Sequence, residues 1–520
     1  MKKYLVLFAL LLSFLAFTAF ASDSFDNTSL SIGYSDGEIV ISGSFDNTDN
    51  VSGTYHIIAA SYDQSGVLKD VKVSSRPIRS GTNGFIMGAD IIMTEQNVKV
   101  FVLTDKMTPI CDVAKRTFRS LRVFAIGNSF SVDAMQWLYG IAKDAGYDHV
   151  VLGNAYIGGC SLSTHRNNAN SGNAAYIYYK NITGTWTAAE NKRLLYCLKD
   201  EDWDLITLQQ ASTYSGQPST YEPYLSELIR YVNHNKTNPN ARIAWHMTWA
   251  YAADCTQSGF ANYGNDQFTM YNAIVSAVQQ KVLTNDGISF VIPSGTAIQN
   301  ARTSVIGDTL NRDGYHLDLQ LGRYIAGLTW LHAISGKPID EITYVPSTTA
   351  IPEYYLRIAK ESVKNAVAHP YEITQSVNTK EYSPEMDYDL ENYDLIDWEP
   401  LGSTYYICTY GTTRYNADNA PYNNTQYFIS SKIFSKSELP NGTLIVADTG
   451  YKYRPEGWES LDKAASKRAS ETSEAVTVVD DAWWGTYNYR AFNISTSNNS
   501  NIANKTAEVI PHFRIYVPKG

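Results

Sequence analysis

The chain has 520 residues, a formal net charge of −10, and a high aromatic content that includes 38 tyrosines and 10 tryptophans. This length is enough for about three domains. The negative charge, together with the lack of any basic stripe in the sequence, argues against nucleic acid as a partner. Aromatic rings of secreted proteins often pack on sugars, but tyrosine also fills β-sandwich cores, so both interpretations stay open.

The first 21 residues have the pattern of a secretory signal peptide. Two lysines follow Met1, an apolar stretch runs from Tyr4 to Phe20, and small residues precede an expected cleavage after Ala21. The residue directly after that site is Ser22 and not a cysteine, so the bacterial lipoprotein pattern is missing, and the later sequence has no run of 18 apolar residues. We therefore expect a secreted or periplasmic protein with no membrane contact after cleavage.

The cysteines are odd in number and form no Cys-x-x-Cys pair, which argues against a disulfide framework or a zinc site. We expect buried free thiols, with one disulfide among the middle three as an open alternative. The five are Cys111, Cys160, Cys197, Cys255 and Cys408.

Residues 22–116 alternate apolar and polar positions and show no helical period. Strand-like runs flank the turn signals Ser35-Asp36-Gly37 and Gln64-Ser65-Gly66. This pattern predicts an Ig-like β-sandwich.

Residues 117–373 alternate short apolar runs with helical patterns, which predicts a parallel sheet covered by helices on both faces. The predicted strands are 122–126, 149–152, 204–208, 242–249 and 288–292. The predicted helices lie near 132–145, 187–199, 221–235, 266–282, 319–335 and 353–367. Five such strands fit a flavodoxin-like three-layer α/β domain with the strand order 2-1-3-4-5.

The last part of the chain returns to strand-like patterns. Residues 374–394 are acidic in their second half and are predicted to be a linker, and residues 395–520 are predicted to form a second β-sandwich. An aromatic cluster in this region indicates either a carbohydrate-binding face or a packed core: Trp483, Trp484, Tyr487 and Tyr489.

Ligands of a doubly wound sheet bind beyond the carboxyl ends of its strands, near strands 1, 2 and 3. Strand 1 is followed by Gly127, Asn128 and Ser129. Ser129 then stands at the head of a helix, where the helix dipole favours a developing negative charge. The alternative is that Asn128 or Ser129 only caps the helix.

The segments after strands 2 and 3 supply candidate donors for an oxyanion. Gly158-Gly159 brings backbone N–H groups close to the strand ends, unless the loop only needs the positive φ of glycine. Gln209 and Gln210 end strand 3, and alternation directs only one of them inward. We expect Gln209 to be the donor, with Gln210 as the alternative.

The segment after strand 5 contains Asp313 and His316. Their spacing lets the carboxylate accept the imidazole N–H and leaves the other ring nitrogen free to take a hydroxyl proton. Asp308 and Asp318 are alternative orienting carboxylates. Strand 5 lies about 14 Å from strand 1, so the segment 293–318 must reach back across the sheet.

Further residues near the predicted cleft are candidates for substrate contacts, namely Asn128, His165 and Tyr315. His246, between Trp245 and Met247, is predicted to be a core histidine.

Together these motifs resemble the SGNH (GDSL-type) hydrolase superfamily. "IGNSFS", "IGGCSL" and "DGYHL" resemble its first, second and last sequence blocks. The third block is usually Gly-x-Asn-Asp, and "LQQAS" departs from it but is similar to the glutamine version of sialate and xylan acetylesterases. "GNSFS", "LQQ" and "RDGYHL" are most similar to the DUF4886 branch, and the resemblance covers about residues 120–370.

The resemblance implies a serine esterase with Ser129 as nucleophile, His316 as general base and Asp313 as its orienting carboxylate. The oxyanion would be held by the N–H groups of Ser129 and Gly159 and by a glutamine side chain, without a metal or organic cofactor. The expected partner is an O-acetylated polysaccharide or glycan; the oligomeric state is not indicated. A non-catalytic glycan-binding protein on a degenerate scaffold and a lipid or thioester hydrolase are the alternatives.

Overall fold

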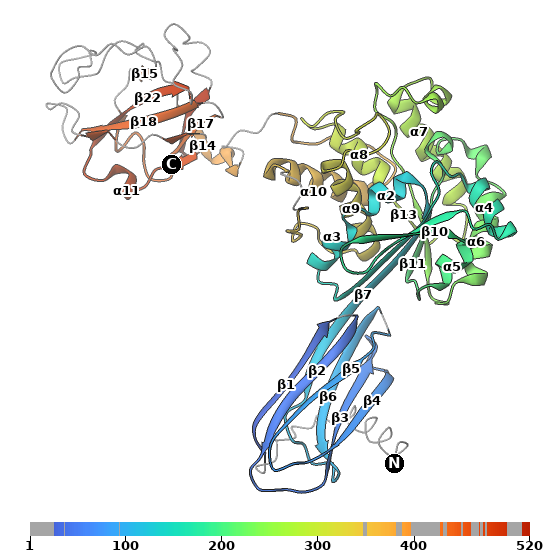
Figure 1. Cartoon of the computed structure of the whole chain (residues 1–520). Helices are drawn as coiled ribbons and strands as arrows, with labels where there is room; N and C mark the ends of the chain where they lie inside the picture. The colour runs from blue at the N-terminus through green and yellow to red at the C-terminus, as the bar shows by residue number, and fades with distance from the viewer. Residues whose placement is uncertain are drawn as a thin grey trace. The chain divides into compact units, whose positions relative to one another are not determined.

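The computed structural model describes residues 25–35, 37–92, 94–346, 351–380, 387–396, 427–429, 434–448, 451–458, 467–468, 472–473, 476–496 and 512–519. Contacts within the chain divide it into two units, residues 1–379 and residues 380–520 (Figure 1). The predicted signal peptide and Cys408 lie outside the described residues. The other four cysteines are free and buried.

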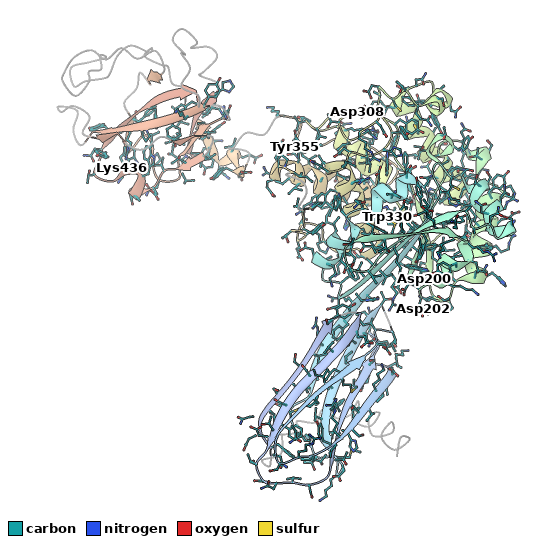
Figure 2. The ribbon with its side chains drawn as sticks, in the orientation of Figure 1. Asp200, Asp202, Asp308, Trp330, Tyr355 and Lys436 are labelled. Carbon is teal, nitrogen blue, oxygen red and sulfur yellow. The ribbon has the colours of Figure 1, made fainter. Side chains whose placement is uncertain are left out.

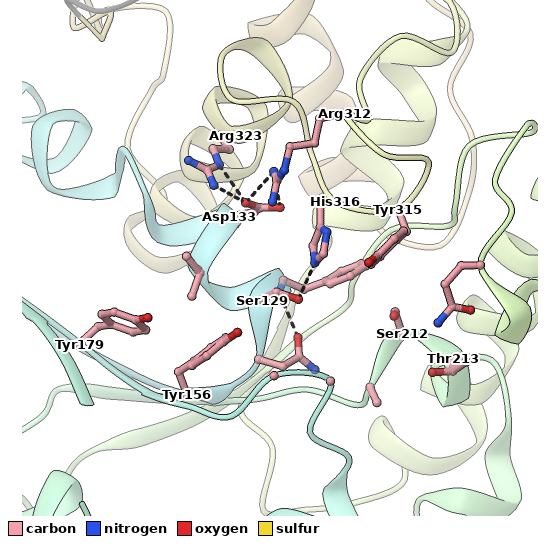
Figure 3. Close-up of a pocket in the computed structure, with 17 residues that line it drawn as sticks. Ser129, Asp133, Tyr156, Tyr179, Ser212, Thr213, Arg312, Tyr315, His316 and Arg323 are labelled. Atoms are coloured by element: carbon pink, nitrogen blue, oxygen red, sulfur yellow. Dashed lines mark hydrogen bonds and ion pairs between the residues drawn. The ribbon is translucent and has the colours of Figure 1, made fainter. Parts of the chain in front are cut away.

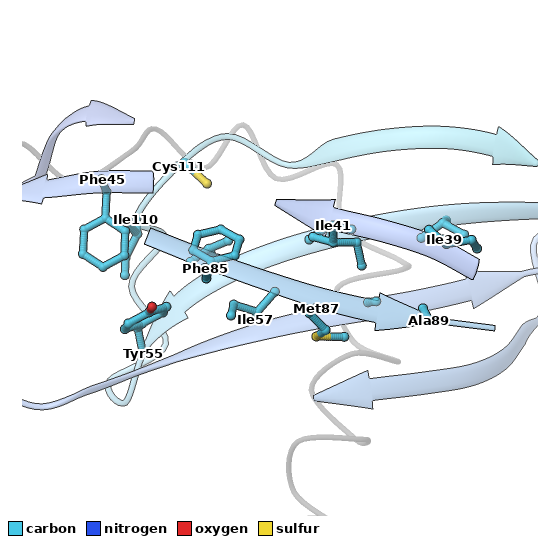
Figure 4. Packing of buried hydrophobic residues seen from close by; sticks show 14 of the residues in the cluster. Ile39, Ile41, Phe45, Tyr55, Ile57, Phe85, Met87, Ala89, Ile110 and Cys111 are labelled. Atoms are coloured by element: carbon cyan, nitrogen blue, oxygen red, sulfur yellow. The ribbon is translucent and has the colours of Figure 1, made fainter. Parts of the chain in front are cut away.

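The N-terminal part of the first unit consists of antiparallel strands that enclose a shared apolar core (Figure 4). The strands are β1 (Phe25–Ser35), β2 (Glu38–Asn47), β3 (Thr54–Tyr62), β4 (Leu68–Pro77), β5 (Gly81–Ala89) and β6 (Glu95–Thr104). β1, β2 and β5 form one sheet, and β3 pairs with β4 and β6 in another. Alternate side chains of both sheets, such as Ile41, Ile57 and Phe85, point into the core, as period-2 patterning requires.

The strand β7 (Ala114–Gly127) belongs to two different pairings. Residues 114–119 pair antiparallel with β6, and residues 120–127 pair parallel with β8 (His149–Tyr156). All residues from Ser120 to Gly127 are buried, as expected for a central strand covered on both faces. The predicted domain boundary between residues 116 and 117 therefore falls inside a continuous strand.

The sheet of the α/β region has the order β10-β9-β8-β7-β11-β12-β13. Its other strands are β9 (Tyr176–Asn181), β10 (Trp186–Lys192), β11 (Leu205–Leu208), β12 (Arg242–His246) and β13 (Phe290–Ile292). β8, β7, β11, β12 and β13 run parallel, which is the order 2-1-3-4-5 by position in the chain. β9 and β10 extend this sheet in antiparallel fashion.

Helices cover this sheet in two groups (Figure 1). One group contains α2 (Ser129–Met135), α3 (Leu138–Asp144), α8 (Ser294–Arg302), α9 (Leu321–Ser335) and α10 (Glu353–Ala368). The other contains α4 (Leu162–Ser171), α5 (Leu194–Lys199) and α6 (Tyr224–Asn235). α7 (Gln267–Ala277) continues into a π-helix over Val278–Val282, and short 3₁₀ helices lie at Ser212–Tyr214, Pro218–Thr220 and Ser258–Tyr263.

Two expectations about these helices are wrong. The helix predicted near 132–145 is divided into α2 and α3, and the first half of the helix predicted at 187–199 is the strand β10. β10 is paired with β9, so the pairing overrides the helical preference of its alanine, glutamate and lysine residues.

Large side chains fill the space between helices and sheet (Figure 2). Trp330 of α9 is fully buried, and its ring meets the His246 ring edge to face at a centroid distance of 5.0 Å. His246 is itself buried at the end of β12, which confirms the prediction of a core histidine. Within the described residues, every helix is too short or too polar to cross a membrane.

The second unit contains two antiparallel sheets. One has the order β14-β23-β17-β21, from β14 (Tyr393–Leu395), β17 (Leu444–Ala447), β21 (Val476–Val478) and β23 (Phe513–Pro518). The other contains β15 (Tyr427–Ile429), β16 (Phe434–Ser435), β18 (Tyr451–Trp458), β19 (Lys467–Arg468), β20 (Thr472–Ser473) and β22 (Tyr489–Thr496). β14 lies partly within the predicted linker.

The aromatic cluster of the second unit lies around α11 (Asp481–Trp484). Trp484 is fully buried in the core of this unit, and its indole N–H donates to the Leu439 carbonyl at 3.2 Å. Trp483 is half-buried against the same core, under the guanidinium of Arg490. Trp484 therefore has a packing role, and a carbohydrate-binding role for this unit stays a prediction.

Candidate active site

Ser129 is the first residue of α2, directly beyond the carboxyl end of β7. Asn128 caps the helix, and its side-chain oxygen accepts the Phe130 N–H at 3.0 Å. The capping role thus falls to Asn128, which leaves the Ser129 hydroxyl for another contact. A Cβ on Gly127 would lie 2.3 Å from the Ser131 hydroxyl oxygen, so only glycine lets the chain turn this closely.

The Ser129 hydroxyl is joined to His316 and, through it, to Asp313. Ser129 Oγ lies 2.8 Å from His316 Nε2 (Figure 3), and His316 Nδ1 lies 2.7 Å from Asp313 Oδ2. Burial opposes ionisation of Asp313, but hydrogen bonds from the His316 ring and from the N–H groups of His316 and Tyr315 outweigh it and lower the Asp313 pKa. The carboxylate therefore stays charged and holds the imidazole with Nε2 toward the hydroxyl.

The segment 303–317 carries His316 back across the sheet from the end of α8. It closes into a tight turn in which the Arg312 N–H donates to the His316 carbonyl at 3.0 Å. Gly314 has a φ of +87°, and a Cβ there would lie 3.0 Å from the Cα of Cys255. The Trp249 indole N–H donates to the Tyr315 carbonyl at 2.8 Å. The position of His316 is thus set by contacts with the core.

The two alternative orienting carboxylates have other partners. Asp308 forms an ion pair with Arg302 at 2.8 Å and accepts the Ala253 N–H at 2.7 Å. Asp318 accepts backbone N–H groups at the start of α9, including that of Gly322. Of the three candidates, Asp313 is the one that contacts the imidazole.

A cavity of about 500 Å³ opens beside Ser129. The predicted site residues Asn128, Gly159, Tyr315 and His316 line it. Several residues that the sequence analysis did not single out also line it, namely Asp133, Tyr156, Tyr179, Ser212, Thr213, Gln257, Arg312 and Arg323. The wall combines polar groups with aromatic and aliphatic ones, and the rings of Tyr156 and Tyr179 meet edge to face at 5.5 Å.

Two residues that line this cavity have backbone donors left unpaired by the described residues. The N–H groups of Ser129 and Gly159 have no protein acceptor among the residues that the structure describes. Gly159 is exposed and adopts a φ of +61°. Asn128 Nδ2 donates to the Cys160 carbonyl at 3.1 Å, which ties the loop after β8 to the head of α2. The geometry thus supports these two groups as oxyanion donors.

The two glutamines after β11 differ from the prediction, because neither lines the cavity. Gln209 donates from Nε2 to Asn128 Oδ1 at 2.8 Å and accepts the His246 Nδ1–H on Oε1 at 2.9 Å. Gln210 accepts the N–H groups of Leu162 and Ala211 and donates to Thr220. Gln209 therefore holds the cap of α2 instead of donating to an oxyanion.

His165 does not contact the cavity, and its predicted role in substrate binding is wrong. α4 turns its side chain into the core, where it is 1% exposed and stacks on the Tyr176 ring at 5.7 Å. Its Nδ1 forms a hydrogen bond with the Tyr176 hydroxyl at 3.1 Å. Burial lowers the pKa of His165 to about 3.

The buried His165 predicts a loss of stability in mild acid. The pKa of His165 in the folded protein lies below its value in the unfolded chain. The neutral ring therefore contributes fully to folding stability above about pH 6.5, and this contribution is lost as the pH falls. Between about pH 7.5 and pH 5, protonation of the unfolded chain at this one residue costs about 2 kcal/mol of unfolding free energy.

We expect His165→Phe, which keeps the ring stack on Tyr176, to reduce the stability difference between these two pH values by that amount. Urea unfolding of both proteins at both pH values measures it. His234→Phe, at an exposed position of α6, is the control. An unchanged pH difference in His165→Phe would contradict the prediction.

Asp133 of α2 lies one turn after Ser129 and was not predicted from the sequence. Its side chain is 1% exposed and accepts from Arg312 Nη1 at 3.1 Å, Arg323 Nε at 2.8 Å and the Leu317 N–H at 3.0 Å (Figure 3). One carboxylate thus joins the helix of Ser129 to the segment of His316 and to α9. The available signal was a charged residue one turn from Ser129 in an otherwise weakly polar helix.

Within the described ranges, no group of three or more His, Cys, Asp or Glu side chains is arranged to hold a metal ion.

The fold and the site define a doubly wound α/β domain with a Ser-His-Asp arrangement beyond the carboxyl end of its central strand. Residues 122–366 match the model of a domain of unknown function, DUF4886. A DUF4886 family protein from Bacteroides uniformis ATCC 8492 is 40% identical, with coverage of 50% of this chain and 100% of that chain and a TM-score of 0.48. The chain belongs to the DUF4886 family, which confirms the family predicted from the motifs.

Two other solved structures are similar at 9% identity. An alpha/beta hydrolase enzyme from the metagenome of Lake Arreo has a TM-score of 0.24, with coverage of 41% of this chain and 95% of that chain. A carbohydrate acetylesterase from Xanthomonas citri has a TM-score of 0.27, with coverage of 91% of this chain and 97% of that chain. No curated protein matches this chain.

Proposed function

We propose that the protein is a secreted or periplasmic serine esterase that removes O-acetyl groups from a polysaccharide or glycan. The observation that carries this proposal is the contact of 2.8 Å between Ser129 Oγ and His316 Nε2, with Asp313 on the other ring nitrogen, at the wall of an open cavity. A hydroxyl that shares its proton with an oriented imidazole is an activated nucleophile.

The proposed reaction proceeds by acyl transfer. Ser129 Oγ attacks the ester carbonyl while His316 Nε2 takes the hydroxyl proton and then gives it to the leaving alcohol. Water attacks the acetyl-enzyme in the same way and releases acetate. The N–H groups of Ser129 and Gly159 stabilise the oxyanion, and loss of one such donor typically costs about 2.7–4 kcal/mol of transition-state stabilisation.

The cavity wall favours a small acyl group on a polar alcohol. Hydroxyl and amide groups of Ser212, Thr213 and Gln257 line it, together with the rings of Tyr156 and Tyr179. Such groups hydrogen-bond and stack with sugars, whereas a long alkyl chain needs a mostly apolar pocket. These contacts support a glycan ester over a lipid ester.

Turnover of p-nitrophenyl acetate and p-nitrophenyl octanoate, and acetate release from a panel of acetylated polysaccharides, test the proposal. We expect hydrolysis of the acetate ester that disappears in Ser129→Ala and persists in Ser226→Ala, a control on α6. A preference for octanoate would favour a lipid or thioester hydrolase. Turnover that does not depend on Ser129 would reject Ser129 as the nucleophile. No turnover of any ester would reject the esterase and favour a non-catalytic glycan-binding protein.

A further inference from the structure

We infer that Arg312 and Arg323 form a subsite for an anionic group of the substrate, next to the ester that is cleaved. The ligand chemistry is a carboxylate or sulfate carried by an acetylated sugar. This inference rests on the proposed esterase function and adds the charge of its substrate.

The charged side chains of the cavity wall carry more positive than negative charge. Besides His316, which is neutral when it acts as a base, they are Asp133, Arg312 and Arg323. One carboxylate faces two guanidinium groups, which leaves one positive charge in excess. Asp313 is not part of the wall and is engaged by His316. Since the chain as a whole has a formal charge of −10, this local excess opposes the general charge of the protein.

The carboxylate of this cluster is saturated and hidden. Asp133 Oδ1 accepts hydrogen bonds from Arg312 Nη1 and Arg323 Nε and forms an ion pair with Arg323 Nη2. Asp133 Oδ2 accepts from Arg312 Nη1 and the Leu317 N–H. The Asp133 side chain is 1% exposed, whereas those of Arg312 and Arg323 are 32% and 15% exposed. A group that enters the cavity therefore meets the cations and not the carboxylate.

The guanidinium groups keep unused donors. Each has five N–H bonds, yet toward the described residues Arg312 uses only Nη1 and Arg323 uses only Nε and Nη2. Nε and Nη2 of Arg312 and Nη1 of Arg323 have no acceptor in the described part of the chain. Free donors on adjacent guanidinium groups match the oxygens of a carboxylate or sulfate.

The cluster lies close to the nucleophile. Arg312 precedes His316 by four residues, and Asp133 lies one helical turn after Ser129, so both cations are held beside the reacting groups (Figure 3). Tyr156 and Tyr179 line the same cavity and offer ring faces to the sugar that carries the anion. An anion on the acetylated sugar or on its neighbour is thus within the space of one cavity.

The test compares three acetyl esters: an O-acetylated methyl glucuronoside, its uncharged uronamide, and an O-acetylated methyl glucoside 6-sulfate as a second anion. We expect wild-type kcat/KM to be about tenfold higher for the better of the two anionic esters than for the uronamide, and this preference to shrink as salt increases. The anionic ester with the higher kcat/KM shows whether the subsite takes a carboxylate or a sulfate. Arg312→Gln and Arg323→Gln each leave a neutral wall, so the preference should disappear in both, while Arg230→Gln on the exposed face of α6 keeps it.

Failure of the subsite and failure of the esterase are distinguishable. Ser129-dependent turnover of all three esters with no preference for an anion overturns the subsite and leaves the esterase. If no ester is turned over, titration of Ser129→Ala with methyl glucuronoside, its uronamide and methyl glucoside 6-sulfate decides the matter. Tighter binding of an anion that is lost in Arg312→Gln supports the subsite, and equal binding overturns it.

Discussion

His316→Ala is expected to lower kcat for p-nitrophenyl acetate by about 10⁴- to 10⁶-fold. The imidazole is the group that contacts Ser129 Oγ, at 2.8 Å, and is in position to take its proton. Because Ser129 and His316 act as a unit, the double variant Ser129→Ala/His316→Ala should lose no more activity than either single variant. Steady-state kinetics of the three proteins measure this.

Two further variants sharpen that result. Asp313→Asn should also lower kcat strongly, because an amide can present its N–H to His316 Nδ1 and so favour the wrong tautomer. His234→Ala, at an exposed position of α6, should leave kcat unchanged. Additive losses in the double variant would show that the hydroxyl and the imidazole act separately, which contradicts the proposed mechanism.

The second large effect is expected at Asp133. Asp133→Asn removes a buried negative charge that pairs with Arg312 and Arg323, so we expect a loss of about 3–5 kcal/mol of unfolding free energy. We also expect kcat to fall, because the same carboxylate accepts the Leu317 N–H beside His316. Asp133 is thus a positioning residue, and unfolding curves and kinetics below the unfolding transition measure the two effects separately.

The matched control for Asp133 is Asp308, which pairs with the buried Arg302 at 2.8 Å and contacts neither Ser129 nor His316. Asp308→Asn should lower stability while kcat stays close to the wild-type value. A fall in kcat of equal size in both variants would mean that general destabilisation, and not the position of the catalytic segment, explains the result for Asp133.

The parallel sheet and the order of the motifs were predictable, because they depend on local patterns. The run at 122–126 is apolar on both faces of its strand, which is typical of a central parallel strand. α8 escaped prediction for the opposite reason: all nine of its residues are buried, so it has no amphipathic period. The strand β10 has helix-forming residues and exists through its pairing with β9.

Site residues were predictable where the position of the backbone determines their role. They were not predictable where a long side chain can reach several different partners. Ser129 and Gly159 follow strand ends, and His316 and Asp313 are neighbours in the chain. The Gln209 amide, in contrast, reaches Asn128 and not the cavity, which only the tertiary contacts decide. The two arginines around Asp133 lie about 180 and 190 residues away from it in the chain, and no local pattern brings them together.

The shared strand β7 limits how this enzyme-like region can be recombined with other proteins. A genetic crossover between residues 116 and 117 would separate Thr117–Arg119 from their paired residues Glu95–Asn97, because β6 would stay on the N-terminal side of the cut. A crossover upstream of Ala114 would keep the strand whole, but the recipient would then need a free sheet edge that accepts residues 114–119. The strand that leads to Ser129 therefore depends on both sheets, and the N-terminal strands and the α/β region form one unit for recombination.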